Sequence, residues 1–309
     1  MKKIVLIFSV VLITGILHAQ DADTAWKVNG DFSVLFSQSS FTNWAPGGEN
    51  SVNINSLFNF YVGYEKGKSK WENFLNLAYG QNKTGELGWR KGEDKIDFQS
   101  TYGLKAADKW YYTANLNFKS QFAEGFDYHD DDPNIGKEKI SNFMAPGYIS
   151  AGLGMEYKPV EYMSFYLAPV TARWIIVNDQ ELANAGAFGV EKAEYDQFDS
   201  TVVLAEGENV RQEFGAYFRF LFVKDIMKNV NYNTKLELFS DYTREPGNID
   251  VNWDNTITMT VNKWINANFS FQVVYDHDTP ILDKDGKTGP RTQFKEVLSV
   301  GLAYKFANR

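Results

Sequence analysis

Few residues in this sequence are suited to chemistry. Of the three histidines, His18 falls in an N-terminal leader, which leaves His129 and His277. The run 127–132 (Asp-Tyr-His-Asp-Asp-Asp) surrounds His129 with carboxylates, but adjacent side chains cannot all point at one ion, so a solvated acidic loop is expected. The run 283–286 (Asp-Lys-Asp-Gly) lacks the third acidic position and the closing glutamate of an EF-hand, which predicts a plain turn. We therefore expect no catalytic residue, metal site or cofactor.

The most unusual stretch is 39–51, Ser-Ser-Phe-Thr-Asn-Trp-Ala-Pro-Gly-Gly-Glu-Asn-Ser. Two interpretations stay open. In the first, the glycine pair supplies positive φ to a loop of fixed shape, and the tryptophan plugs a pore mouth or contacts a partner. In the second, the segment is a surface turn whose tryptophan packs on a rim. The candidate loop residues are Asn43, Trp44, Gly47, Gly48, Glu49 and Asn50.

Composition narrows the class of protein. With 309 residues, 44% hydrophobic and 16% aromatic, the chain has ample apolar surface to bury and is not a disordered polymer. The absence of cysteine excludes disulfides, thiol catalysis and cysteine-bound metal. A net charge of -8 and a pI near 5.1 argue against a nucleic-acid partner. No segment after residue 20 approaches the roughly 18 apolar residues of a membrane-spanning helix.

The N-terminus has the layout of a cleaved export signal. Two lysines precede an almost wholly apolar run, Ile4–Leu17, and Ala19 provides the small residue at the cleavage point. We expect a signal peptide over 1–19, a short periplasmic segment over 20–26 and one β domain over 27–309. The alternative is an N-terminal anchor helix.

The rest of the chain alternates between apolar and polar residues, as strands with two different faces do. In 265–275, for example, Phe269 and Phe271 lie on one face and Asn268 and Gln272 on the other. Three segments fit less well, because Phe74 lies on a polar face, Pro169 interrupts a strand and Glu296 lies on an apolar face. Twelve strands are predicted near 27–37, 51–64, 71–81, 95–105, 110–122, 147–158, 164–177, 211–223, 230–242, 249–261, 264–276 and 293–306.

The connections between these segments alternate between short and long, with 243–248 as a short member of the long set. A soluble β-sandwich has no reason to follow this rule, whereas a transmembrane up-and-down barrel has short periplasmic turns and longer extracellular loops. Aromatic residues near the short turns fit a belt at the membrane interface. These are Tyr64, Trp71, Trp110, Tyr111, Tyr157, Tyr162, Trp264 and Tyr304. A soluble β protein with core aromatics is the alternative.

The polar face then lines a barrel lumen with charges of both signs, so strong ion selectivity does not follow. A barrel of about twelve strands is intermediate in strand number between small barrels filled by side chains and open porins. Each charge has a second interpretation, as a lumen salt bridge that only holds the barrel together. The candidate lumen residues are Asn53, Asn55, Asn115, Asn117, Lys119, Arg219, Lys235, Glu237 and Asn268, with Lys27, Asp31 and Asp254 on the same face.

The last strand keeps Leu298, Val300 and Leu302 on one face and ends with Tyr304 and Phe306. This resembles the C-terminal signal that the outer-membrane assembly machinery reads, although three residues follow the final phenylalanine. On the motif of 39–51, the whole mature chain also resembles the uncharacterised outer-membrane family numbered 3078 in the domain-of-unknown-function series. The resemblance implies a barrel in the outer membrane and carries no activity or site.

Three functions stay open: a narrow channel or transporter for small solutes, an interaction or assembly barrel that acts through its extracellular loops, and an enzyme at the rim. We expect the first or second, since an enzyme has only two histidines to draw on. The expected partners are outer-membrane lipid and the assembly machinery; solute and protein partner stay undefined.

Overall fold

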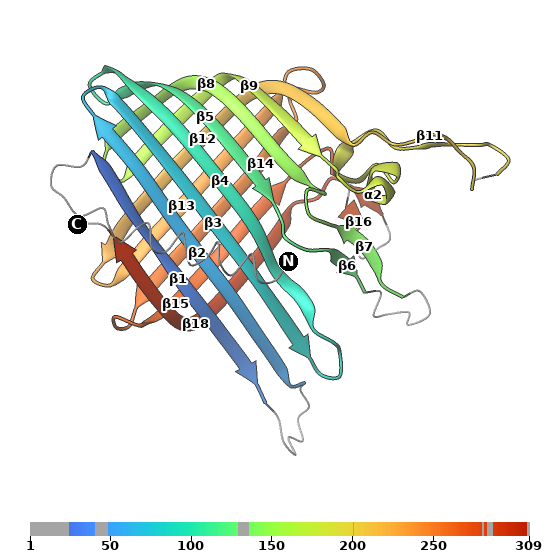
Figure 1. Cartoon of the computed structure of the whole chain (residues 1–309), viewed down its shortest axis with the longest axis horizontal. Coiled ribbons are helices and arrows are strands. Elements are labelled where there is room, and N and C mark those ends of the chain that lie inside the picture. Colours follow the sequence, from blue (N-terminus) through green and yellow to red (C-terminus); the bar gives the residue numbers. More distant parts are fainter. Residues whose placement is uncertain are drawn as a thin grey trace, which may run out of the picture.

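The computed structural model describes residues 25–40, 49–128, 136–199, 201–279, 281–282 and 287–307. Within them, twelve antiparallel strands form a closed barrel in which the first strand pairs with the last (Figure 1). The predicted fold class is thereby confirmed. The barrel strands are β1 (Trp26–Ser39), β2 (Ser51–Lys66), β3 (Ser69–Thr84), β4 (Arg90–Ala107), β5 (Trp110–Ser120), β8 (Gly147–Val160), β9 (Met163–Ile176), β12 (Val210–Met227), β13 (Val230–Asp241), β14 (Ile249–Thr260), β15 (Ile265–Tyr275) and β18 (Gln293–Ala307).

The two ends of the barrel differ. The turn end carries the connections 67–68, 108–109, 161–162, 228–229 and 261–264, and tight turns there place Gly67, Lys109 and Asn229 at positive φ. The loop end carries the connections 40–50, 85–89, 121–146, 177–209, 242–248 and 276–292. The predicted alternation holds, except that β3 and β4 pair further than expected and shorten their connection to 85–89.

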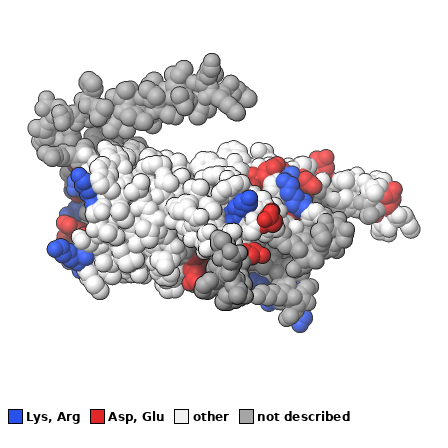
Figure 2. Space-filling view, turned by 90° about the horizontal axis from the view of Figure 1, so that it is seen from below, with Lys and Arg blue, Asp and Glu red and all other residues white. Residues whose placement is uncertain are grey.

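Alternation along the strands sorts side chains between the two faces of the wall. The outer face exposes large apolar residues, including Phe36, Leu153, Leu298 and Leu302, which are 50%, 63%, 68% and 64% exposed. The inner face holds polar residues that are nearly buried, such as Asp97, Thr101 and Glu156. In Figure 2 the charged residues gather toward the two ends, and a broad uncharged band lies between them.

The irregular positions in the sequence have local explanations. Pro169 lies at a bulge in β9, because Thr171 pairs with Gly215 but Ala168 pairs with Tyr217. A bulge accepts a residue that cannot donate to the ladder, and it reverses the inward parity of the rest of the strand. Phe74 faces the lumen, where its ring lies 4.8 Å from that of Tyr61.

Aromatic pairs line the turn end. Trp26 lies 4.9 Å from Tyr64, and Trp110 lies 4.6 Å from Tyr157, measured between ring centroids. Tyr111 departs from the expected belt. It pairs with Glu156 on the lumen side of the wall, because it alternates with its outward neighbours.

Two loops form a small cap over part of the loop end. A helix, α2 (Gln180–Asn184), and a one-turn 3₁₀ helix, η1 (Ala187–Gly189), bury an apolar cluster made of Ala145, Val177, Leu182, Ala183 and Val190. Three two-stranded hairpins also belong to this end: β6 (Gly125–Asp127) with β7 (Glu138–Ser141), β10 (Glu194–Tyr195) with β11 (Val203–Ala205), and β16 (Ile281–Leu282) with β17 (Thr288–Gly289). The β10–β11 hairpin projects far from the barrel (Figure 1). No helix in the described ranges is long and apolar enough to cross a bilayer.

Candidate functional site

The lumen brings the sequence-predicted polar residues together. Asn55, Asn115 and Asn117 are almost fully buried in it, and the Asn115 side-chain amide donates a 2.8 Å hydrogen bond to the Thr101 hydroxyl. Asn268 accepts a 2.9 Å hydrogen bond from the Thr258 hydroxyl. Asn53 lies nearer the loop end, and its side-chain oxygen has no partner among the described residues.

At the centre of the lumen, Glu237 of β13 collects several partners. Its carboxylate lies 2.5 Å from the Lys119 ammonium and 3.4 Å from that of Lys235, and it accepts a 2.7 Å hydrogen bond from the Tyr217 hydroxyl. Lys235 continues the network with a 3.0 Å ion pair to Asp97. Glu237 and Asp97 are 5% and 2% exposed, so these charges are held largely away from bulk water.

Toward the turn end the network continues through a second group. The Arg219 guanidinium lies 3.3 Å from the Glu156 carboxylate, which in turn lies 3.3 Å from Lys158. Lys158 also pairs with Glu72 at 2.6 Å, and Glu72 pairs with Lys70 at 3.2 Å. Charges of opposite sign therefore alternate from the centre of the lumen toward the turn end.

Toward the loop end a third group is built on arginine. Arg173 of β9 binds the carboxylates of Glu213 and Asp250. Arg211 binds Glu213 and also Asp278, which follows β15. The Arg211 guanidinium donates a further hydrogen bond to the Gly189 carbonyl at 3.2 Å, which ties the cap to the barrel wall.

Several of these pairs cross the lumen instead of running along one wall. In the barrel order, four strands lie between β13 and β4. Lys235 of β13 nevertheless contacts Asp97 of β4. Lys119 and Glu237 likewise stand on strands with three others between them. Side chains thus bridge opposite walls at mid-height. The network also leaves buried atoms without a partner in the described part of the chain, among them Asn117 Oδ1 and Asp254 Oδ2, which offer sites to water.

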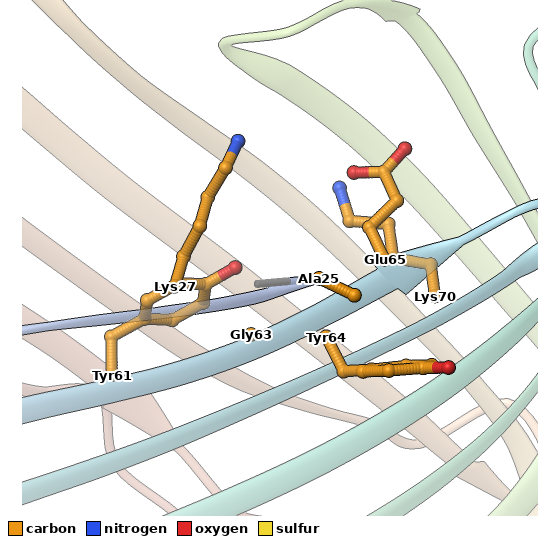
Figure 3. A pocket seen from close by; sticks show the side chains of 7 residues that line it. All are labelled: Ala25, Lys27, Tyr61, Gly63, Tyr64, Glu65 and Lys70. Atoms are coloured by element: carbon orange, nitrogen blue, oxygen red, sulfur yellow. The ribbon is translucent and has the colours of Figure 1, made fainter. Parts of the chain in front are cut away.

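A hollow lies at each end of this bridged region. The one at the turn end has a volume of about 60 Å³, and Lys27, Tyr61, Glu65 and Lys70 line it. Figure 3 shows the side chains of Lys27, Glu65 and Lys70 on one side of the ribbon and the Tyr64 ring on the other. The hollow at the loop end is larger, about 200 Å³.

A charged contact outside the barrel wall holds the cap. The Lys139 ammonium lies 2.8 Å from Asp179, the residue that caps α2, and 3.0 Å from Glu181. Although burial opposes it, hydrogen bonds from Lys139 and Asn142 keep the pKa of Asp179 below its usual value. Hydrogen bonds to Asp179 and Glu181 raise the pKa of Lys139.

The loop and metal hypotheses fall mostly outside the described residues. Asn43, Trp44, Gly47 and Gly48 are outside them, whereas Glu49 and Asn50 are described and exposed. The Asn50 carbonyl accepts a 2.7 Å hydrogen bond from the Gly85 amide, which joins the base of this loop to the next connection. His129, most of the acidic run and 283–286 also lie outside. In the part that is described, no group of three or more His, Asp or Glu side chains is placed to hold a metal ion.

Sequence reasoning missed several members of the network. Arg211, Glu213 and Tyr217 share the inward parity of Arg219, so the alternation of β12 was a sufficient signal for them. Arg173 was not predicted to face the lumen because the bulge at Pro169, which precedes it in β9, reverses which residues of the strand point inward. No local signal marks Asp97 and Glu156 as partners of residues more than 60 positions away.

Comparison with known protein families gives a match to part of the chain. The model of the family described as "Protein of unknown function (DUF3078)" matches residues 36–126. The predicted resemblance is therefore confirmed over that region, which contains the 39–51 motif. No curated protein matches the chain.

Among solved structures, an outer membrane channel from Pseudomonas putida F1 is similar with a TM-score of 0.39 and 9% identity, covering 94% of this chain and 98% of that one. The NanC porin has a TM-score of 0.35 and 8% identity, with 89% and 98% covered. A FadL homologue of Pseudomonas aeruginosa has a TM-score of 0.29 and 9% identity, with 90% and 89% covered.

Proposed function

We propose that this chain is an outer-membrane barrel whose lumen is a narrow passage for small polar solutes, constricted at rest by ion pairs between opposite walls. Its location is supported by the outer face, where apolar residues such as Leu298 and Leu302 stay mostly exposed. Soluble monomers rarely expose apolar patches beyond a few hundred Å², whereas hydrocarbon favours such a surface. The purified protein should require detergent and migrate faster on gels before heating than after.

The observation that carries the channel proposal is the central charged bridge of Lys119, Glu237, Lys235 and Asp97. Buried ion pairs stabilise a fold less than apolar residues of similar volume, because each charge must be desolvated. Stability alone therefore does not account for a charged bridge at this position. Charged bridges and unpaired polar atoms instead suit a passage that is closed at rest, whose bridges can part to admit water and a polar solute.

The test is single-channel recording in planar bilayers. The double variant Lys119→Gln, Glu237→Gln removes both charges of one cross-lumen pair at nearly constant volume, so openings should become larger or more frequent than in the parent. The matched control is Lys224→Gln, Asp225→Asn, which removes one charge of each sign from exposed positions near the turn end of β12 and should leave the openings as they are. Folded parent and variant that both stay silent would contradict a channel.

The biogenesis of the barrel belongs to the same proposal. Leu298, Val300, Leu302 and Tyr304 are exposed on the outer face of β18, the strand that completes the barrel. We propose that this apolar face, together with Phe306 near the end of β18, is read by the outer-membrane assembly machinery. Deleting residues 304–309 should reduce membrane insertion in cells more than a deletion within 196–202.

A second candidate function rests on the projecting hairpin. Phe198 lies between β10 and β11 and is 97% exposed, and Leu204 is 62% exposed. Apolar side chains this far from the wall favour contact with another macromolecule, which suits an interaction barrel. Phe198→Ser should abolish capture of such a partner and leave conductance unchanged; a variant that alters conductance alone would contradict this role.

A further inference from the structure

The hollow at the loop end carries an excess of negative charge. Carboxylates of Asp241, Glu245, Asp250 and Asp278 line its volume of about 200 Å³, together with Arg244 and His277. These residues come from three connected places in the fold: the end of β13 and the connection after it, the start of β14, and the connection after β15. The hollow therefore stands at the mouth through which a solute from outside would enter.

The nearby arginines do not neutralise this charge. Arg173 reaches Asp250 and Arg211 reaches Asp278, but each of them also binds Glu213. With Arg244 included, three guanidinium groups thus face five carboxylates. A surplus of negative charge remains on the side of Asp241 and Glu245.

Asp241 gives the second, independent observation. Its residue is only 7% exposed although it lines the hollow. The Thr243 amide and hydroxyl donate to one carboxylate oxygen at 2.9 and 2.7 Å, and the other oxygen has no partner in the part of the chain that the structure describes. A buried carboxylate oxygen without a donor is costly, so a ligand that supplies N–H donors and positive charge would be favoured there.

We propose that this hollow is a binding site for the primary ammonium or guanidinium group of a small organic cation. A bare metal ion fits less well, because the described residues contain no cluster of three carboxylate or imidazole groups placed as ligands. An ammonium group needs only acceptors around it, which Asp241, Glu245 and the remaining oxygens of Asp250 and Asp278 provide. The inference deepens the proposed function, on which it rests, by naming the class of solute that enters the passage.

The experiment is isothermal titration of the folded, detergent-solubilised protein with cadaverine (1,5-diaminopentane). Cadaverine should bind, and binding should weaken as salt is raised. Glutarate, a five-carbon dicarboxylate of opposite charge, should not bind. Arg244→Gln removes the cation that lines the hollow, so cadaverine affinity should stay the same or rise.

Two double variants make the test specific to the hollow. Asp241→Asn, Glu245→Gln removes two charges while keeping acceptors for Thr243 and Asn248, and it should weaken cadaverine binding by about tenfold or more. Glu65→Gln, Asp225→Asn removes two charges at the turn end and should leave the affinity unchanged. Because Glu245 is exposed, Glu245→Gln alone retains the fold and should still weaken binding measurably.

The outcomes separate this site from the channel. Absence of cadaverine binding, stronger binding of glutarate, or equal loss in the two double variants would overturn the site. A protein that binds cadaverine here but never opens in a bilayer would overturn the passage and keep the site. A protein that opens in a bilayer but does not bind cadaverine would overturn the site and keep the passage.

Discussion

Replacing Phe269 by arginine tests whether the two faces of the wall are lipid and lumen. Phe269 lies near the middle of β15, on the outer face, and pairs with Ile257 of β14 and Leu298 of β18. Asn268, the adjacent residue, faces the lumen. One residue of sequence thus separates two environments of opposite polarity.

The expected magnitude follows from these positions. An arginine on the lipid face near the bilayer midplane costs roughly 2–4 kcal/mol. At about 1.4 kcal/mol per tenfold change, Phe269→Arg should lower the folding equilibrium constant by roughly 30- to 700-fold. Asn268→Arg places the same charge on the polar lumen face, beside Thr258 and Ser299, and forfeits the hydrogen bond from Thr258, worth about 0.5–1.5 kcal/mol.

The assay is urea titration of the barrel in lipid vesicles, with the folded fraction read from gel migration before and after heating. Phe269→Arg should fold at markedly lower urea concentrations than the parent, and Asn268→Arg should stay close to it. Equal tolerance, or the reverse order, would refute the assignment of the two faces.

Three further outcomes are expected. Glu237→Ala leaves the Lys119 ammonium without its ion-pair partner and the buried Tyr217 hydroxyl without its acceptor. The free energy of unfolding in the same urea assay should therefore fall by about 3–5 kcal/mol, whereas a loss below about 1 kcal/mol would mean that the bridge is hydrated and loose. A peptide tag beside Phe198 should be reachable by antibody on intact cells, and one at Gly67 only after the outer membrane is opened; the opposite labelling would invert the topology. The cap gains stability from Asp179, whose pKa is lower in the folded state than its usual 3.8, so that contribution is present above pH 3.8 and is lost as pH falls further. Lys139, whose pKa is raised, acts in the opposite sense, with a contribution present below pH 10.5 and lost at higher pH. Pepsin should therefore cut segment 177–209 of the parent faster as the pH falls through 3.8. The Asp179→Asn variant already lacks this contribution, so at pH 4 it should be cut as fast as the parent is cut below pH 3.8.

The strands were predictable because their signal is local. Alternation over ten residues distinguishes Phe269 from Asn268 without knowledge of any other strand. The same rule places Lys119, Arg219 and Glu237 on the inner face.

The pairing inside the lumen was not predictable in this way. Lys119 and Glu237 are 118 residues apart, and their contact follows from closure of the wall and not from either strand. The cap has no periodic pattern, since α2 is five residues long and its stability comes from an N-cap and a few apolar contacts. Arg173 shows a third limit, because a single bulge exchanges the inner and outer faces for every later residue of its strand.

The pairing of β1 with β18 has a consequence for how the chain reaches its native state. Asn29 pairs with Ala307, and the ladder runs only to Phe36 with Val300, so this seam joins the most distant parts of the sequence through a short set of contacts. Bringing such distant segments together has a large entropic cost, which makes the seam a late event in folding. Until it forms, an eleven-strand intermediate presents two unpaired edges, each a template for another chain. Because β18 is the last of these strands along the chain, the intermediate stays open to pairing with another chain until β18 takes its place between β15 and β1.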